Sequence, residues 1–165
     1  DPGRVTPDYA KALRIPGKAS YIAIHANHPR EFTDDARTAI ATLADAGHVL
    51  LSQSVLLKGV NADVETLGAL MRTFVENRIK PYYLHHPDLA PGTSHLRLTL
   101  EEGQALVKSL RGNLSGLCQP TYILDIPGGA GKIPVGPAFL SGCEMPGVEA
   151  VAEDRHGGQH VYPPA

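Results

Sequence analysis

The feature that most constrains this sequence is the alternation of short apolar strands with amphipathic helices. Strand-like runs occur at 21–26, 48–57, 79–86 and 119–127, and helical patterns separate them at 32–47, 62–78 and 99–110. Parallel strands need crossover connections of about a dozen residues or more, and helices of this length supply them. Three such units and one further strand are too few to close a barrel. The sequence therefore predicts an α/β fold whose parallel sheet is open or forms part of a barrel, with exposed edges.

Both ends of the chain depart from this alternation. A short helical segment at 7–14 precedes the first strand, and because the sequence does not begin with methionine we interpret it as a piece of a longer chain. From 137 onward glycine and proline are frequent and no period is clear, which predicts loops or a short meander, to which VEAVAED could add one small strand. We therefore expect an α/β unit over 1–136 and an irregular extension over 137–165.

Composition excludes some classes of function. The formal net charge of −2 and the isoelectric point near 6.5 give no basic surface for nucleic acid or for an anionic membrane. No signal peptide and no membrane-spanning run is visible, so we expect a cytoplasmic protein. The two cysteines, Cys118 and Cys143, form no zinc or iron–sulfur motif. Two free thiols are the simplest interpretation, while a disulfide or a shared metal site stays open.

Polar side chains gather where the predicted strands pass into loops, which is where sites form in parallel α/β proteins. They are His25, Asn27 and His28 at the first strand, Gln53 in the second, His85, His86 and Asp88 after the third, and Asp125 and Lys132 at the last. Structural roles stay open for each of them. HANHP is equally compatible with a capped turn, Gln53 with a backbone partner, and each aspartate with loop stabilisation. Two aspartates at one cleft would suit a cationic ligand.

Lys132 ends the stretch DIPGGAGK, behind three glycines and seven residues after Asp125. A phosphate-binding P-loop would need Ser or Thr after the lysine and a different glycine spacing, so the sequence excludes that class. One alternative is a solvated loop lysine. The other is a Schiff-base amine for a carbonyl cofactor such as pyridoxal phosphate.

Four segments carry a resemblance to a known family: HANHPREFT, LLSQSVLLKGVN, KPYYLHHPDLAPGTSHLRL and LRGNLSGLCQPTYILDIPGGAGKIPV. Over about 20–140 the chain resembles the carboxyl-terminal half of lysine 2,3-aminomutase, a pyridoxal-phosphate-dependent radical SAM enzyme. The combination of PYYLHHPDL and DIPGGAGK, in that order, makes the resemblance specific. It implies a partial TIM-type barrel of the radical SAM kind, of which this chain would supply only the carboxyl-terminal half.

The resemblance also implies roles for individual residues. Lys132 matches the lysine that forms the Schiff base with pyridoxal phosphate. Asp88 and Asp125 match the pair that holds the side-chain ammonium of the substrate lysine. His25 and Gln53 match contacts of S-adenosylmethionine. No residue of this segment matches a metal ligand.

The implied reaction is the isomerisation of L-lysine to β-lysine by a radical 1,2-amino shift. It requires a 4Fe-4S cluster and an electron donor, but the motif C-x-x-x-C-x-x-C is absent, so this segment alone is expected to be inactive. The zinc site of some relatives, and the assembly that it supports, are in doubt because their cysteines are missing; a homo-oligomer stays open. Three alternatives remain: a relative that makes β-lysine for elongation factor P, one that acts on another amino acid, or a non-catalytic pyridoxal-phosphate-binding domain.

Overall fold

The computed structural model describes residues 1–142, 150–154 and 156–162. Its main sheet contains β1 (Tyr21–His25), β2 (Val49–Val55), β3 (Ile79–His85), β4 (Thr121–Ile126) and β5 (Gly131–Pro134), in that spatial order. Strands β1 to β4 run parallel, and β5 pairs antiparallel with β4. The predicted α/β fold with an open, mostly parallel sheet is therefore confirmed.

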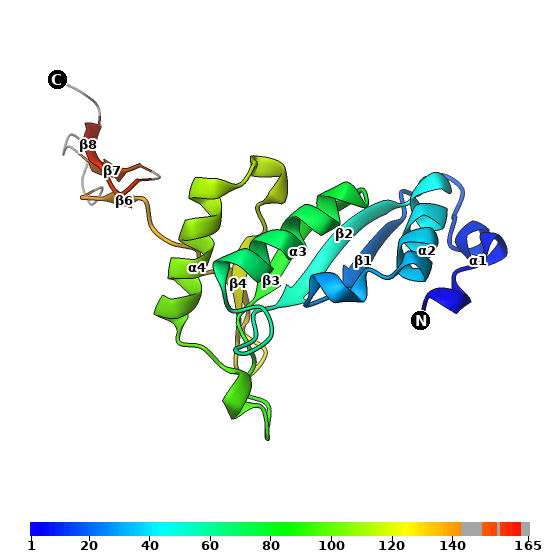
Figure 1. Ribbon diagram of the computed structural model, residues 1–165, viewed down its shortest axis with the longest axis horizontal. Coiled ribbons are helices and arrows are strands. Elements are labelled where there is room, and N and C mark those ends of the chain that lie inside the picture. The colour runs from blue at the N-terminus through cyan, green and yellow to red at the C-terminus, as the bar shows by residue number, and fades with distance from the viewer. Residues whose placement is uncertain (143–149, 155, 163–165) are drawn as a thin grey trace.

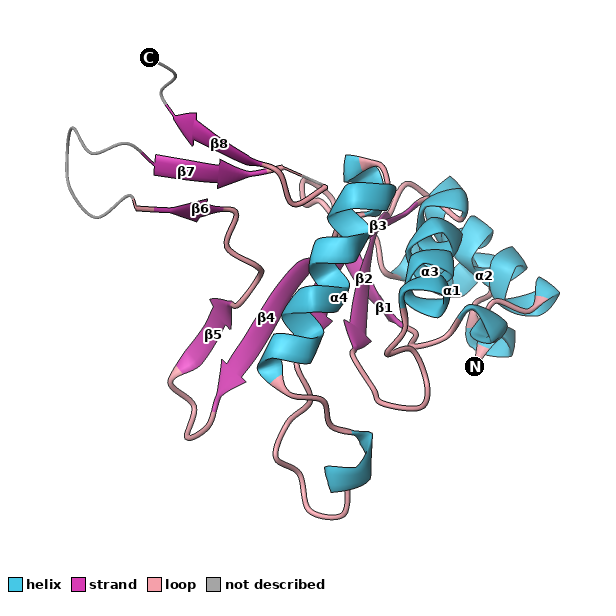
Figure 2. Cartoon of the chain, turned by 60° about the vertical axis from the view of Figure 1, so that its left-hand side comes forward, coloured by secondary structure: helices cyan, strands magenta, loops and turns pink. Residues whose placement is uncertain are grey.

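In the described part of the chain, four α-helices accompany the sheet (Figures 1 and 2): α1 (Pro7–Ala12), α2 (Asp34–Asp45), α3 (Val64–Glu76) and α4 (Leu100–Asn113). Short 3-10 helices occur at Pro2–Arg4, Pro29–Glu31, Ser94–Leu96 and Gly116–Cys118. The crossover helices α2, α3 and α4 begin at side-chain caps supplied by Thr33, Asp63 and Thr99. These caps accept hydrogen bonds from backbone N–H groups that a helix start leaves unpaired, which fixes where each helix begins.

The hydrophobic core lies between the helices and one face of the sheet. The α3 side chains Leu67, Leu70, Met71 and Phe74 are fully buried, as the helical spacing predicts. Val64, which the same spacing places in the core, is 40% exposed. It is the first residue of α3, directly after the Asp63 cap, and lies where the chain enters the helix from solvent.

A β-bulge in β3 decides which side chains face the core. Ser52 of β2 pairs with Pro81, but Gln53 pairs with Tyr83, so Tyr82 is an extra residue in β3. Before the bulge Pro81 is core-facing, and after it Leu84 is. Because side chains alternate along a strand, the extra residue turns Tyr83 and His85 to the face opposite the helices. Sequence analysis did not predict this bulge.

The segment after 137 forms, in its described part, the short meander that the sequence allowed beside loops. Three short strands, β6 (Leu140–Ser141), β7 (Ala150–Glu153) and β8 (Gln159–Tyr162), form an antiparallel sheet at the end of the molecule opposite α1 (Figure 1). β7 lies within VEAVAED, where a small strand was allowed. An ion pair of 2.5 Å between Lys108 and Glu153 connects this sheet to α4. The irregular tail of the sequence-based prediction is thus, in its described part, a small meander.

Cys118 does not belong to the main sheet. Cys118 is buried as a free thiol in the 3-10 helix before β4, while Cys143 lies outside the described residues. Among the described residues, no helix combines the length and the apolar character that a bilayer crossing requires.

Candidate functional site

A cavity of about 290 Å³ opens at the carboxyl ends of the parallel strands, on the sheet face opposite the helices. Its lining consists of His25, Gln53, Val55, His85, His86, Asp88, Asp125 and Lys132. All five residues predicted to bind cofactor or substrate therefore lie around one cavity, although they come from β1, β2, β4, β5 and the loop after β3. The roles assigned to them remain predictions.

The ends of β1 and β2 are fixed by two asparagines rather than by ligand-binding groups. Asn61, which is fully buried, accepts a hydrogen bond from the Leu57 N–H at 2.7 Å and donates to the carbonyls of Asn27 at 2.8 Å and Val55 at 2.9 Å. Asn27 in turn accepts from the Val55 N–H at 2.8 Å. These bonds set the positions from which His25 and Gln53 face the cavity.

HANHP forms the capped turn that sequence analysis had left as an alternative to a binding role for Asn27 and His28. The ring nitrogen Nδ1 of His28 accepts from the Arg30 N–H at 3.1 Å, and the Glu31 carboxylate accepts from the backbone of Asn27 and His28. Both side chains thus satisfy the backbone of the turn. Of this segment, His25 alone lines the cavity.

Asp125 and Lys132 are directly opposite each other in the β4–β5 hairpin. The seven-residue spacing places Lys132 across from Asp125 on a paired strand, so the expectation that Lys132 sits in a loop is wrong. The turn between them uses Gly128 and Gly129 with φ near +85° and +79°, a region that strongly favours glycine. The ammonium of Lys132 donates to Oδ1 of Asp125. The glycines therefore serve the tight return of the chain that brings amine and carboxylate together.

The electrostatics of this pair favour the charged form of the Asp125 carboxyl. The Lys132 ammonium, together with a hydrogen bond from His85, holds the pKa of the Asp125 carboxyl below its usual value, although partial burial opposes the shift. The side chain of Asp125 is 29% exposed and that of Lys132 is 46% exposed. A primary amine in this position is accessible from the cavity and could bind a carbonyl compound covalently.

His85 connects Asp125 to Gln53. Its Nδ1 lies 3.0 Å from Oδ2 of Asp125, and its Nε2 lies 3.0 Å from the amide nitrogen of Gln53. Sequence analysis noted His85 as a polar strand-end residue but assigned it no role. The missing signal was its partner, which lies 40 residues away in the chain and becomes a neighbour only through the pairing of β3 with β4.

Asp88 faces the same cavity from the loop after β3. Arg97 holds this loop: its Nε donates to the Asp88 carbonyl at 3.1 Å, and its Nη2 donates to the Ala90 carbonyl at 2.6 Å and to the Thr93 hydroxyl at 3.1 Å. Within the part of the chain that the structure describes, the Asp88 carboxylate makes no ion pair. It is therefore a second carboxylate that a cation entering the cavity can meet.

His86 lines the cavity beside Tyr122, whose ring belongs to the core. Nδ1 of His86 lies 2.7 Å from the Tyr122 hydroxyl. Burial lowers the pKa of His86 and raises the pKa of Tyr122 above its usual value. Both groups are thus neutral at neutral pH, and one hydrogen bond joins the hydroxyl to the ring nitrogen.

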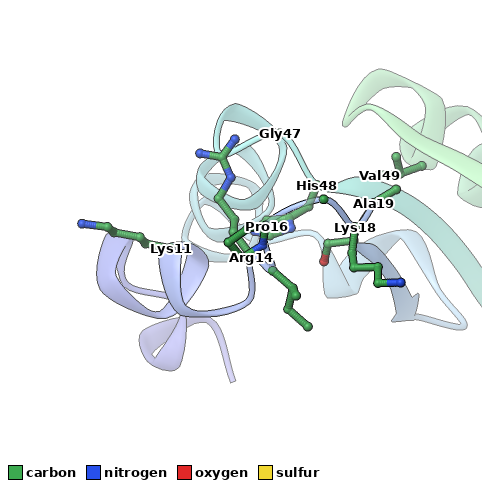
Figure 3. A pocket seen from close by; sticks show the side chains of 11 residues that line it. Lys11, Arg14, Pro16, Lys18, Ala19, Gly47, His48 and Val49 are labelled. Carbon is green, nitrogen blue, oxygen red and sulfur yellow. The ribbon is translucent and has the colours of Figure 1, made fainter.

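A larger cavity, of about 540 Å³, lies at the opposite edge of the sheet, where β1 and β2 begin. It is lined by three cationic residues, but Figure 3 shows Lys11, Arg14 and Lys18 pointing in different directions rather than toward a common point. Ser20 and His48 are the other polar residues of its lining, and no carboxylate belongs to that lining. No cluster of three His, Cys, Asp or Glu side chains among the described residues could hold a metal ion.

Comparison with known proteins gives this constellation a context. The family described as Lysine-2,3-aminomutase matches residues 107–146, which include Asp125, Lys132 and the glycine turn between them. L-lysine 2,3-aminomutase from Clostridium subterminale is 40% identical over 139 residues, 84% of this chain and 33% of the relative. The chain belongs to the lysine 2,3-aminomutase family.

Other relatives are named for two different amino acids, lysine and glutamate. L-lysine 2,3-aminomutase from Bacillus subtilis is 35% identical over 120 residues, 73% of this chain and 26% of the relative. Glutamate 2,3-aminomutase from Clostridioides difficile is 37% identical over 139 residues, 84% of this chain and 33% of the relative. These relatives are named as aminomutases, which are isomerases. The chain spans about a third of the length of the first curated relatives that it matches.

Proposed function

We propose that this chain supplies the pyridoxal-phosphate lysine and the substrate-ammonium site of an aminomutase that converts L-lysine to β-lysine. The observation that carries the proposal is a single cavity that contains one accessible primary amine, Lys132, and two carboxylates, Asp88 and Asp125. An amine of this kind suits a carbonyl cofactor, and two carboxylates suit a cationic substrate.

The residues present fit pyridoxal phosphate. Lys132 reaches the cavity, and no atom lies within 4 Å of the position that a Cβ would take on Gly128 or Gly129, so the turn beside the amine is open. When bound, the cofactor supplies a carbonyl carbon for amines and a conjugated ring that can delocalise an unpaired electron. Lys132 would bind it, and Asp125 keeps the amine oriented at the cavity.

Lysine is favoured over glutamate as the substrate. Moving an ammonium out of water is costly unless a carboxylate compensates it, and Asp88 and Asp125, which both line the cavity, can provide that compensation. The same two groups would repel an acidic side chain. Relative affinities for lysine, glutamate and arginine therefore test the substrate separately from the cofactor.

His25 and Gln53 are the proposed contacts of S-adenosylmethionine. Both line the same cavity and present polar groups to it. The sheet carries its helices on one face and these residues on the other, an arrangement that supports our inference of a partial radical SAM barrel. A 4Fe-4S cluster does not fit this chain, since its two cysteines cannot supply three ligands.

Covalent trapping tests the proposal directly. The complete natural polypeptide is incubated with pyridoxal phosphate, reduced with borohydride and mapped by peptide mass spectrometry. We expect the reduced pyridoxyl group on Lys132, because it is the lysine that lines this cavity. Lys132→Ala should abolish the labelling and the visible absorbance of the bound cofactor.

Lys18→Ala is the matched control, since Lys18 lies at the opposite edge of the sheet and should leave labelling unchanged. A label on a different lysine that persists in Lys132→Ala would refute the cofactor assignment. Trapping at Lys132 without measurable lysine binding would favour a non-catalytic cofactor-binding protein.

A further inference from the structure

We propose that His85 is a positioning residue that holds both Gln53 and Asp125, and so links the two halves of the cavity. It contacts one proposed cofactor residue and one proposed substrate residue at the same time. The hydrogen-bonded chain runs from Gln53 through His85 and Asp125 to Lys132. The assignment of its ends to S-adenosylmethionine and lysine rests on the proposed function, whereas the geometry of His85 does not.

The position of His85 is strongly determined by the fold. The β-bulge at Tyr82 turns it to the cavity face, and its side chain is only 11% exposed. The ring of Tyr83 packs edge-on against it with centroids 5.9 Å apart. A buried imidazole with both nitrogens in hydrogen bonds cannot rotate freely. It therefore holds the side chains of Gln53 and Asp125 in fixed orientations.

The partners also determine the tautomer of His85. A carboxylate oxygen only accepts, so Nδ1, at 3.0 Å from Oδ2 of Asp125, must carry the proton and donate. In the neutral ring Nε2 is then the acceptor, and the amide N–H₂ of Gln53 donates to it at 3.0 Å. Asp125 and Gln53 thus impose complementary requirements that one neutral tautomer satisfies.

This arrangement divides the two oxygens of Asp125. Oδ2 is taken by His85, while Oδ1 is taken by the Lys132 ammonium. Oδ1 is therefore the oxygen that a substrate ammonium could take when Lys132 is engaged elsewhere, and His85 fixes the plane in which it points. On the Gln53 side of His85, one amide N–H of Gln53 donates to the ring, and the amide oxygen of Gln53 can accept a hydrogen bond from a ligand.

The tautomer can be measured in the unliganded protein. Histidine-labelled ¹⁵N spectra of the complete natural polypeptide, with the His85 signal assigned by its loss in His85→Asn, report which ring nitrogen carries hydrogen. We expect a protonated Nδ1 and an unprotonated Nε2 at neutral pH. A His85 signal with Nε2 protonated and Nδ1 unprotonated would overturn the proposal.

Two conservative variants separate the two contacts. The amide of Asn reaches about as far as Nδ1 of histidine, so His85→Asn should keep the bond to Asp125 and lose the bond to Gln53. The longer Gln reaches the position of Nε2, so His85→Gln should do the reverse. We expect His85→Gln to weaken lysine binding about tenfold or more and His85→Asn to weaken S-adenosylmethionine binding by a similar factor, each with the other ligand little changed. His85→Phe should weaken both.

Calorimetric binding to the cofactor-loaded polypeptide gives these affinities without relying on turnover. Equal losses for both ligands in both amide variants would refute the positioning role and indicate a general packing effect. If the natural protein binds neither ligand, the proposed function fails, and the tautomer measurement still decides the claim about His85.

Discussion

Gly103 occupies a position in α4 at which no side chain fits. A Cβ there would lie 2.0 Å from the hydroxyl oxygen and 2.7 Å from Cζ of Tyr122. Tyr122 is 1% exposed and cannot move aside without disturbing the core, and its hydroxyl bonds to His86 at the cavity. The absence of a side chain at Gly103 thus leaves room for Tyr122, which in turn holds His86 at the cavity.

We expect Gly103→Ala to destabilise the protein by about 2 kcal/mol, because overpacking a tight core outweighs the better helix propensity of alanine. Gly68→Ala in α3 is the matched control: its Cβ would meet only Leu110 and Leu114, at 3.7 and 3.8 Å. That change should be neutral or stabilising. Urea unfolding of both variants provides the measurement, and equal stability of the two would contradict the packing argument.

At the scale of elements, Asn61 joins the ends of β1 and β2 to the turn before α3. Its three hydrogen bonds satisfy the Leu57 N–H and the carbonyls of Asn27 and Val55, all in partly buried positions. Asn61→Ala leaves these groups unpaired, each at a cost of about 1–3 kcal/mol. We expect a loss of about 3 kcal/mol or more in the free energy of unfolding, measured by chemical denaturation.

Asn113→Ala provides the comparison for this prediction. Asn113 is exposed at the end of α4 and donates only to the Ser109 carbonyl. The same amide-to-methyl change should alter stability there by less than about 0.5 kcal/mol. A similar loss at both positions would show that Asn61 is not a structural hub.

The helices and strands that could be predicted from the sequence are those defined by a pattern of residues close together in the chain. The four parallel strands and three crossover helices follow from periodicity and caps such as Thr33 and Thr99. Strand β5 was missed because its residues are exposed and it exists only as the partner of β4. The bonds of His85 were missed for a related reason, since strand register, rather than the identity of the residue, selects its partners.

At the scale of the whole molecule, the resolved pKa shifts of acids and histidine act in one direction. Hydrogen bonds from Thr66, Lys132 and His160 lower the pKa of Asp63, Asp125 and Asp154 respectively, the last to about 2. Burial lowers the pKa of His86 from 6.5. In every case the unfolded chain binds protons more readily than the folded one, so acid favours unfolding.

We therefore expect stability to decline in two stages as pH falls. The first begins below about pH 6.5, where unfolded His86 takes up a proton that the folded ring resists. The second begins below about 3.8 and continues toward 2, as the aspartates protonate. Urea midpoints at a series of pH values measure both stages. His86→Gln should reduce the first and leave the second, whereas an unchanged profile would contradict the assignment.

The bulge at Tyr82 has an evolutionary consequence. Loss of the bulge at unchanged strand length would pair Gln53 with Tyr82 and turn His85 toward the helices. Deletion of Tyr82 would instead remove the bulge and leave Gln53 opposite Tyr83, so His85 would stay on the cavity face. Relatives that lack one residue between Pro81 and Leu84 would therefore keep the same cavity lining, although their strand is shorter.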